Sequence, residues 1–173
     1  MANSACLTDK FTNLIEQSVF NYMSSRIFLD IMPKSPTMKD FCFFMRCRAL
    51  SFITLNDLTQ KEDNDGSMKY MSRYLDEVIL KLKCIDEGGS VYLVIRCIEQ
   101  SIIAIADLFH IVLGFKTPAG SEDILPIFLF CLIKANLKRA QSIFNYLDLM
   151  MIKEERRGKD GFNFTQVETG IKY

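Results

Sequence analysis

Residues 120–136 read GSEDILPIFLFCLIKAN, and this stretch decides the fold class. Two acids, Glu122 and Asp123, stand before ten uncharged, mostly apolar residues that include Pro126. Acids in the first turn of a helix complement the helix dipole, and a proline near the start costs no essential backbone hydrogen bond. The stretch therefore predicts a core helix over residues 122–136, with an apolar run too short to span a membrane.

Helical spacing continues on both sides of this stretch. Apolar residues recur every three or four positions almost throughout the chain, and strict alternation is nearly absent. We predict an all-α protein, a layered bundle of about six helices in a single domain over residues 1–173. The helices are expected at about residues 9–31, 37–52, 71–85, 90–113, 122–136 and 138–157. The polar residues 60–66 and the segment GKDGFNFTQ, residues 158–166, are expected to be irregular.

Local signals place several helix starts and buried faces. Thr8 is expected to cap the first helix, Thr37 and Asp40 to form a capping box for the second, and Ser90 to cap the fourth. The first helix is expected to bury Phe11, Leu14, Ile15, Val19, Tyr22 and Met23. The second is expected to carry Phe41, Phe44, Met45, Ala49 and Phe52. The third and fourth carry Met71, Tyr74, Leu75, Val78, Leu82, Ile85, Val94, Ile98, Ile102, Ile105, Phe109 and Val112.

The charge balance excludes two function classes. Lys plus Arg and Asp plus Glu both number 21, so the formal net charge is zero. A nucleic-acid binder would carry a basic excess on one face, and a dedicated binder of anionic membranes would carry a polybasic segment. The densest basic stretch, residues 153–159, is interleaved with Glu154 and Glu155. We therefore expect no nucleic-acid partner and no direct membrane insertion.

Cysteine and histidine usage predicts neither a metal site nor a disulfide scaffold. The six cysteines form no C-x-x-C pair, and His110 is the single histidine. Most of these cysteines sit in apolar runs, where a free cysteine behaves as a small buried hydrophobe. We expect no metal and no cofactor, and a reduced, cytoplasmic compartment. The N-terminus shows no secretory signal peptide.

No motif of covalent or acid–base catalysis is present. The chain contains no G-x-S-x-G, no Walker loop, no H-E-x-x-H and no glycine-rich strand-to-helix turn. His110 lies in the apolar run LFHIVLG, which favours a packed or surface imidazole. Function is therefore expected to come from binding another molecule.

The residues around the quoted stretch resemble the vacuolar-protein-sorting-nine guanine-nucleotide exchange domain. That family shows two acids, an apolar residue, Leu-Pro, an apolar helix and Ile-Lys-Ala-Asn, then Ser-x-x-x-Tyr and a Gly-x-x-Gly-aromatic-x-Phe-Thr turn. The matching residues here are 122–126, 133–136, Ser142, Tyr146, Gly158, Gly161, Phe162, Phe164 and Thr165. The resemblance covers about residues 9–170 and is specific over 120–165. It implies an all-α exchange factor for a Rab small GTPase of the early-endosomal class, held at endosomal membranes through its partners.

The resemblance also implies which residues act. The family's acidic finger lies four positions before the proline, which is Glu122, where relatives usually have aspartate; neighbouring Asp123 is the alternative working acid. Pro126, Phe162, Phe164 and Thr165 are implied to contact the GTPase, and Phe162 stands where relatives usually have tyrosine. A carboxylate delivered to the nucleotide site can pair with the phosphate-loop lysine and compete with Mg²⁺ and phosphate for it. An apolar groove between the last helices would hold the switch regions.

Two other readings stay open. A catalytically weak or inactive relative would keep the fold and act as a GTPase- or scaffold-binding module. An unrelated helical carrier of lipid or another apolar ligand would use the 14 phenylalanines and nine methionines, although such residues at helical spacing are usually core. Neither the particular Rab nor the oligomeric state is specified by the sequence.

Overall fold

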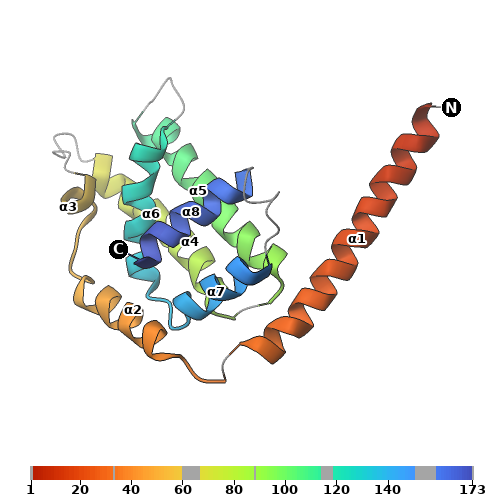
Figure 1. The fold of residues 1–173 in the computed structure, drawn as a ribbon. Helices are drawn as coiled ribbons and strands as arrows, with labels where there is room; N and C mark the ends of the chain where they lie inside the picture. The colour runs from red at the N-terminus through yellow and green to blue at the C-terminus, as the bar shows by residue number, and fades with distance from the viewer. Residues whose placement is uncertain are drawn as a thin grey trace.

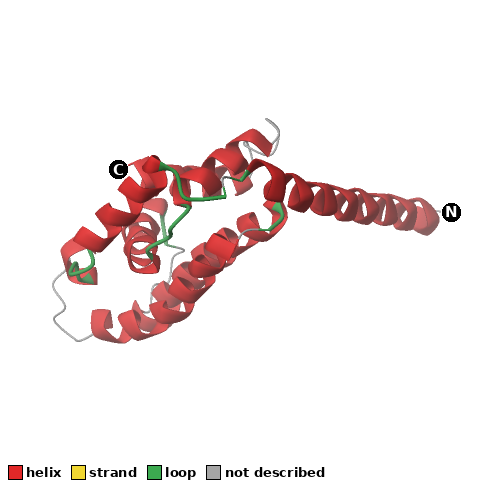
Figure 2. Ribbon diagram, turned by 90° about the horizontal axis from the view of Figure 1, so that it is seen from below, coloured by secondary structure: helices red, strands yellow, loops and turns green. Residues whose placement is uncertain are grey.

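The computed structural model describes residues 2–32, 34–59, 67–87, 89–113, 119–150 and 159–172. Most of these residues are helical, with no strand among them, which confirms the all-α prediction (Figure 2). Eight α-helices and a 3-10 helix are present in the described ranges, against the six helices expected. They are α1 (Ala2–Ile31), α2 (Met38–Ala49), α3 (Leu55–Thr59), α4 (Ser67–Lys83), η1 (Cys84–Glu87), α5 (Val91–Leu113), α6 (Ser121–Ala135), α7 (Ala140–Met150) and α8 (Lys159–Lys172).

The core is built from α4, α5 and α6, with α7 and α8 packed across them (Figure 1). Helices α4 and α5 bury most of the predicted apolar series, including Leu75, Val78, Ile98 and Ile105, whereas Tyr74 faces solvent. The side chain of Val112 lies outside the described residues. Leu93 N–H donates to Ser90 Oγ at 3.3 Å, which confirms Ser90 as the cap of α5. The predicted loop at residues 60–66, the expected helix stop at Gly114 and the end of the sixth predicted helix lie outside the described residues.

The first helix contradicts its predicted packing. It begins at Ala2, so Thr8 lies inside it and is not its N-cap. Its predicted face is exposed: Leu14, Ile15, Val19, Tyr22 and Met23 are each more than half accessible to solvent. The reason is that the first half of α1 projects away from the bundle (Figure 1). Its second half reaches the bundle, where Gln17, Phe20 and Asn21 line a pocket with α5, and Ser24, Phe28 and Met32 are buried. The side chain of Phe11 lies outside the described residues.

Tyr146 of α7 holds the end of α1 to the bundle. Its hydroxyl donates to the Ser24 carbonyl oxygen at 2.6 Å, and its ring meets Phe28 edge-on with centroids 5.0 Å apart. Burial raises the pKa of Tyr146, while the hydrogen bond to Ser24 opposes that shift. The phenol therefore stays protonated as a donor near neutral pH.

We predict that Tyr146→Phe lowers the free energy of unfolding by about 1 kcal/mol, the usual net value of one buried hydrogen bond. The ring contact with Phe28 is retained, so the loss isolates the hydroxyl. Urea unfolding followed by circular dichroism measures it. Tyr74→Phe, at an exposed tyrosine of α4, is the matched control and should leave stability unchanged. Equal stability of Tyr146→Phe and the wild-type chain would contradict this role.

The second helix confirms its start but not its face. Thr37 N–H and Oγ1 donate to Asp40 Oδ2 at 2.8 and 2.6 Å, and Asp40 N–H donates to Thr37 Oγ1 at 3.2 Å, which completes the predicted capping box. The residues that α2 buries are Asp40, Phe43 and Cys47. Of the five residues expected on this helix, Phe44 is half-buried, whereas Phe41, Met45, Ala49 and Phe52 are exposed and Phe52 lies beyond its end. The expected series followed the wrong side of the helix.

Two carboxylates from other elements cap the start of α7. Asp86 of η1 accepts the backbone N–H groups of Lys138 and Arg139 at 2.7 and 3.1 Å. Asp40 of α2 accepts the Ser142 N–H at 2.8 Å and also the Ser142 hydroxyl. Helix N-termini leave several N–H groups without intrahelical partners, so these acids fix where α7 begins. The turn between α6 and α7 is thereby locked to α2 and η1.

The segment expected to be an irregular turn is helical. Residues 159–172 form α8, so the GFNFT sequence lies within a helix. Phe164, Val167 and Ile171 are buried at spacings of three and four residues, on a face that packs against α5, α6 and α7. Burial of this face outweighs the helix penalty of Gly161 and Gly170, about 1 kcal/mol for each glycine.

Candidate functional site

The start of α6 presents the two predicted acids. Gly120 is the N-cap, and its backbone N–H donates to Asp123 Oδ2 at 3.2 Å. Asp123 is half-buried, whereas Glu122 is exposed. The side chain of Asp123 therefore has a capping role, as the sequence allowed, and Glu122 is the more accessible acid.

Both carboxylates gather around Gly120. A Cβ built on Gly120 would lie 3.7 Å from Glu122 Oε1 and 3.8 Å from Asp123 Oδ2. Glu122 is held by no hydrogen bond or ion pair within the described parts of the chain. The two charges are stabilised by the positive end of the α6 dipole. The result is a local concentration of negative charge in which the Glu122 side chain is exposed.

Pro126 shapes the turn that carries these acids. In a regular helix the N–H of residue 126 would bond to the carbonyl of residue 122, but proline has no N–H. With α6 beginning at Ser121, this intrahelical bond is lost. The expectation that this proline costs no hydrogen bond was therefore wrong. The Glu122 carbonyl is released from the helix ladder, and Pro126 itself is half-buried.

Helix α8 sorts the other predicted residues onto two faces. Phe164 is buried and stacks on Phe144 of α7, with ring centroids 4.8 Å apart. Thr165 is exposed. Residues 162 and 165 are three apart and share one side of a helix, although the side chain of Phe162 lies outside the described residues. Phe164 thus anchors α8, while Thr165 faces outward.

The two halves of the candidate site are joined where α8 crosses α6. At Gly170 an added Cβ would lie 2.6 Å from Leu132 Cδ2 and 3.0 Å from Leu129 Cδ2, so the close approach uses the missing side chain. At a rise of about 1.5 Å per residue, Glu122 lies roughly 10 Å from this crossing along α6, and Thr165 roughly 8 Å along α8. An interface of about 800 Å² per partner extends roughly 30 Å. Measured along the two helices, the distance from Glu122 to Thr165 is therefore smaller than the extent of such an interface.

The rest of the predicted motif has structural roles. Asn136 adopts the left-handed conformation, with φ 52°, that ends α6. Lys134 donates to the Ser51 carbonyl oxygen at 2.6 Å, beyond the end of α2. Ser142 and Tyr146 make the contacts to Asp40 and Ser24 described above. These residues end α6 and connect α6 and α7 to the α2 region and to α1.

An apolar cavity that the sequence did not reveal lies between α2, α3, α6 and α8. Its volume is about 280 Å³. It is lined by Phe43, Arg46, Cys47, Leu50, Ile53, Leu58, Leu129, Leu132, Ile133 and Gly170. Burial raises the pKa of the Cys47 thiol to about 11, against the opposing charge of Arg46, so the thiol is neutral at physiological pH. The helical spacing of Phe43, Cys47 and Leu50 is the sequence pattern that could have indicated the cavity-lining side of α2.

The described residues contain no group of three or more acidic, histidine or cysteine side chains that could hold a metal ion. Across the same residues, no helix is both long and apolar enough to cross a bilayer. The fold and the geometry of the site describe an all-α protein in which exposed Glu122 and half-buried Asp123 begin a buried helix, α6, that α8 crosses.

The comparison with known families agrees with this class. The model of the vacuolar sorting protein 9 (VPS9) domain matches residues 75–173, which is more than half of the chain. The chain therefore belongs to the VPS9 domain family, whose members are in general exchange factors for Rab GTPases. The match begins within α4, so α1, α2 and α3 precede it. No curated protein matches the chain.

Proposed function

We propose that this chain is a guanine-nucleotide exchange factor for a Rab small GTPase of the early-endosomal class, with Glu122 as its acidic finger. Residues 1–173 act as a single domain whose working part is 120–165, and the protein reaches endosomal membranes through its partners. The accessible carboxylate of Glu122 at the head of α6 is the observation that carries the proposal.

Glu122 is favoured over Asp123 by geometry. Asp123 accepts the Gly120 N–H, so moving it into a partner would leave a helix N–H without its acceptor. Glu122 carries no such bond to the described residues, and its side chain is one methylene longer than aspartate. Since Pro126 frees the Glu122 carbonyl from the ladder, the backbone of this turn can also adjust on binding.

The chemistry follows from competition for one lysine. In the GDP-bound GTPase the phosphate-loop lysine and Mg²⁺ neutralise the phosphates. A carboxylate that pairs with this lysine weakens nucleotide binding, and by reciprocity GDP weakens binding of the exchange factor. Pro126, together with Phe162 and Thr165 on one side of α8, would hold the switch regions, while Phe164 keeps α8 in place against Phe144.

Release of a fluorescent GDP analogue from a panel of purified Rab proteins tests the proposal. We expect the chain to accelerate release from an early-endosomal Rab in proportion to its concentration, and to bind the nucleotide-free form most tightly. The second candidate, an inactive binding module, predicts no acceleration and a preference for the GTP-loaded form. It is favoured by two departures from the family pattern, Glu122 for aspartate and Phe162 for tyrosine.

The departure at Phe162 gives a separate prediction. Phe162→Tyr should raise the catalytic efficiency of exchange by about three- to tenfold, because a hydroxyl at an interface can add one net hydrogen bond. The same release assay measures it on the Rab that responds best. The matched control is Phe41→Tyr, at an exposed phenylalanine of α2, which should leave the rate unchanged. A rate that falls in Phe162→Tyr would show that position 162 requires an apolar edge.

A further inference from the structure

Helix α2 is apolar on the side that faces away from the core. Met38, Cys42, Met45 and Ala49 follow at spacings of four, three and four residues, which places them along one stripe opposite the buried Phe43 and Cys47. Met38 is 75% exposed, Met45 45% and Phe41, beside the stripe, 55%. A surface helix ordinarily turns its polar side outward. The outward stripe of α2 is therefore unusual for a helix in contact with water alone.

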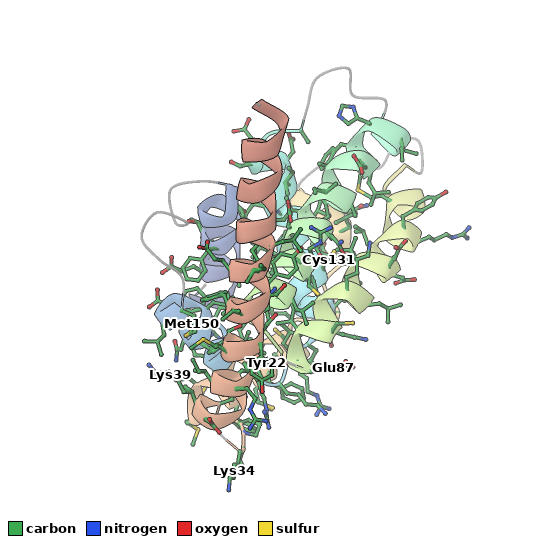
Figure 3. All side chains as sticks on the ribbon, turned by 90° about the vertical axis from the view of Figure 1, so that its right-hand side faces the viewer. Tyr22, Lys34, Lys39, Glu87, Cys131 and Met150 are labelled. Atoms are coloured by element: carbon green, nitrogen blue, oxygen red, sulfur yellow. The ribbon has the colours of Figure 1, made fainter. Side chains whose placement is uncertain are left out.

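The charges around this stripe have one sign. Lys39 lies on one flank of it and Arg48 on the other, and Lys34 stands just before the helix. Arg46, on the same flank as Lys39, turns its guanidinium to α8, where it donates to the Ile171 carbonyl oxygen. All four cations are exposed, and Lys34 points away from the bundle (Figure 3). The sole acid of residues 34–52 is Asp40, which is fully buried. Although the whole chain is neutral, the outer surface of α2 is purely cationic.

We infer that the outer face of α2, made of Met38, Phe41, Cys42 and Met45 with the flanking cations, docks on an anionic membrane surface. Interfacial helices bury an apolar stripe among lipid headgroups while flanking Lys and Arg side chains meet the anionic lipids. Charge complementarity selects this occupant, because each exposed charge on the face is positive. An acidic protein would need matching acids on both sides of an apolar ridge, whereas a lipid surface supplies them without a specific sequence.

A polybasic sequence motif does not mark this face. Its cations are separated along the chain and come together only around the stripe, so no polybasic segment is present. The proposal revises the sequence-based exclusion of an anionic-membrane binder, because side chains would enter the headgroup region, although no helix of the described residues is long and apolar enough to cross a bilayer. Residues 34–52 also precede the part of the chain that matches the VPS9 family.

The docking face is separate from the acids of α6. Leu129, Leu132 and Ile133, in the second half of α6, share the apolar cavity with Phe43 and Leu50 of the α2 region. Glu122 lies at the other end of α6, seven residues before Leu129. A membrane in contact with α2 would therefore leave the acid end open to a GTPase. The inference does not depend on exchange activity, because vesicle binding is measured without a GTPase.

Co-sedimentation with vesicles tests the inference. The full chain should bind phosphatidylcholine vesicles that contain phosphatidylserine at about 0.1 M salt, where charges interact over roughly 10 Å, and bind pure phosphatidylcholine at least tenfold more weakly. Phe41→Ser/Met45→Ser and Lys39→Glu/Arg48→Glu should each reduce binding about tenfold or more. Arg46 is left unchanged because it donates to the Ile171 carbonyl oxygen at 3.2 Å.

Matched controls lie on α4. Tyr74→Ser/Leu80→Ser replaces two apolar residues of similar exposure, 57% and 61%, and Arg73→Glu/Lys83→Glu reverses two exposed cations. Both should bind as the wild-type chain does, and circular dichroism should show all four variants folded. Equal binding to neutral and anionic vesicles, or full binding by folded α2 variants, would overturn the inference. Loss of GDP release from a soluble Rab in the α2 variants would instead assign the face to a protein partner.

Discussion

Replacing Glu122 by alanine should reduce accelerated GDP release by about a hundredfold, a loss typical of removing one preorganised electrostatic group from a catalytic site. The carboxylate is exposed at the head of α6 and bonded to no described residue, so its removal should not disturb the fold. The rate of fluorescent-GDP release at saturating concentrations of the domain measures the change. Helical content and unfolding temperature should match those of the wild-type chain.

Two variants separate the acidic finger from a general effect of charge. Glu77→Ala removes an exposed glutamate of α4, whose carboxylate lies 3.1 Å from Lys81 Nζ, and should leave the release rate unchanged. Asp123→Ala removes the acceptor of the Gly120 N–H, so it should cost stability while keeping most of the activity per folded molecule. If Asp123→Ala abolishes release and Glu122→Ala does not, Asp123 is the working acid.

Replacing Asp40 by alanine should have the largest effect on stability. Four donors, from Thr37 and Ser142, converge on this fully buried carboxylate, which connects α2 to the start of α7. Its loss leaves buried donors without acceptors, at about 1–3 kcal/mol each. We expect the free energy of unfolding to fall by about 3 kcal/mol or more, a large fraction of the 5–15 kcal/mol typical of a domain. Urea unfolding measures the difference.

Thr54 and Asp57 form a similar pair, and they supply the control for Asp40→Ala. Asp57 accepts the N–H and hydroxyl of Thr54 at 2.7 Å each, as Asp40 does with Thr37, but it is exposed on α3. Asp57→Ala should therefore cost much less than Asp40→Ala. Similar losses in both variants would show that Asp40 acts only as a local cap, without the connection to Ser142.

Asp40 also makes the stability of the fold depend on pH in the acidic range. Burial alone would raise the pKa of Asp40, but the hydrogen bonds from Ser142 and Thr37 together lower the pKa below its usual value of 3.8. A carboxyl whose pKa is lower in the folded chain stabilises the fold above about pH 4, and this stabilisation is lost as the pH falls through the folded value. Asp40→Asn should thus lose less stability between pH 5 and acid than the wild-type chain does.

Local sequence patterns correctly predicted the features that depend only on residues close together in the chain. The capping box of Thr37 and Asp40, the cap at Ser90 and the core series of α4 and α5 are encoded within a few positions of the chain. Helix α8 was missed because its glycines signal a turn, whereas its stability comes from Phe164, Val167 and Ile171 packing on three other helices. Tertiary burial of this kind cannot be read from local propensity.

The spacing of apolar residues did not predict which side of α1 and α2 is buried. The apolar residues of α1 recur at helical spacing, yet Leu14 and Val19 are more than half exposed. On α2 the sequence offers apolar residues on both sides, and the buried Asp40 shows which side faces inward. In the candidate site, the exposure of Glu122 and the capping contact of Asp123 required coordinates, because both acids fit either role by sequence.

Removing both carboxylates at once tests the central claim most directly. Glu122→Gln/Asp123→Asn keeps the size and polarity of the two side chains but deletes their negative charge, whichever acid does the work. On the Rab that responds to the wild-type chain, the account predicts GDP release no faster than the spontaneous rate, with α-helical content retained. Release as fast as with the wild-type chain would contradict it, because nucleotide displacement would then need no negative charge at the start of α6.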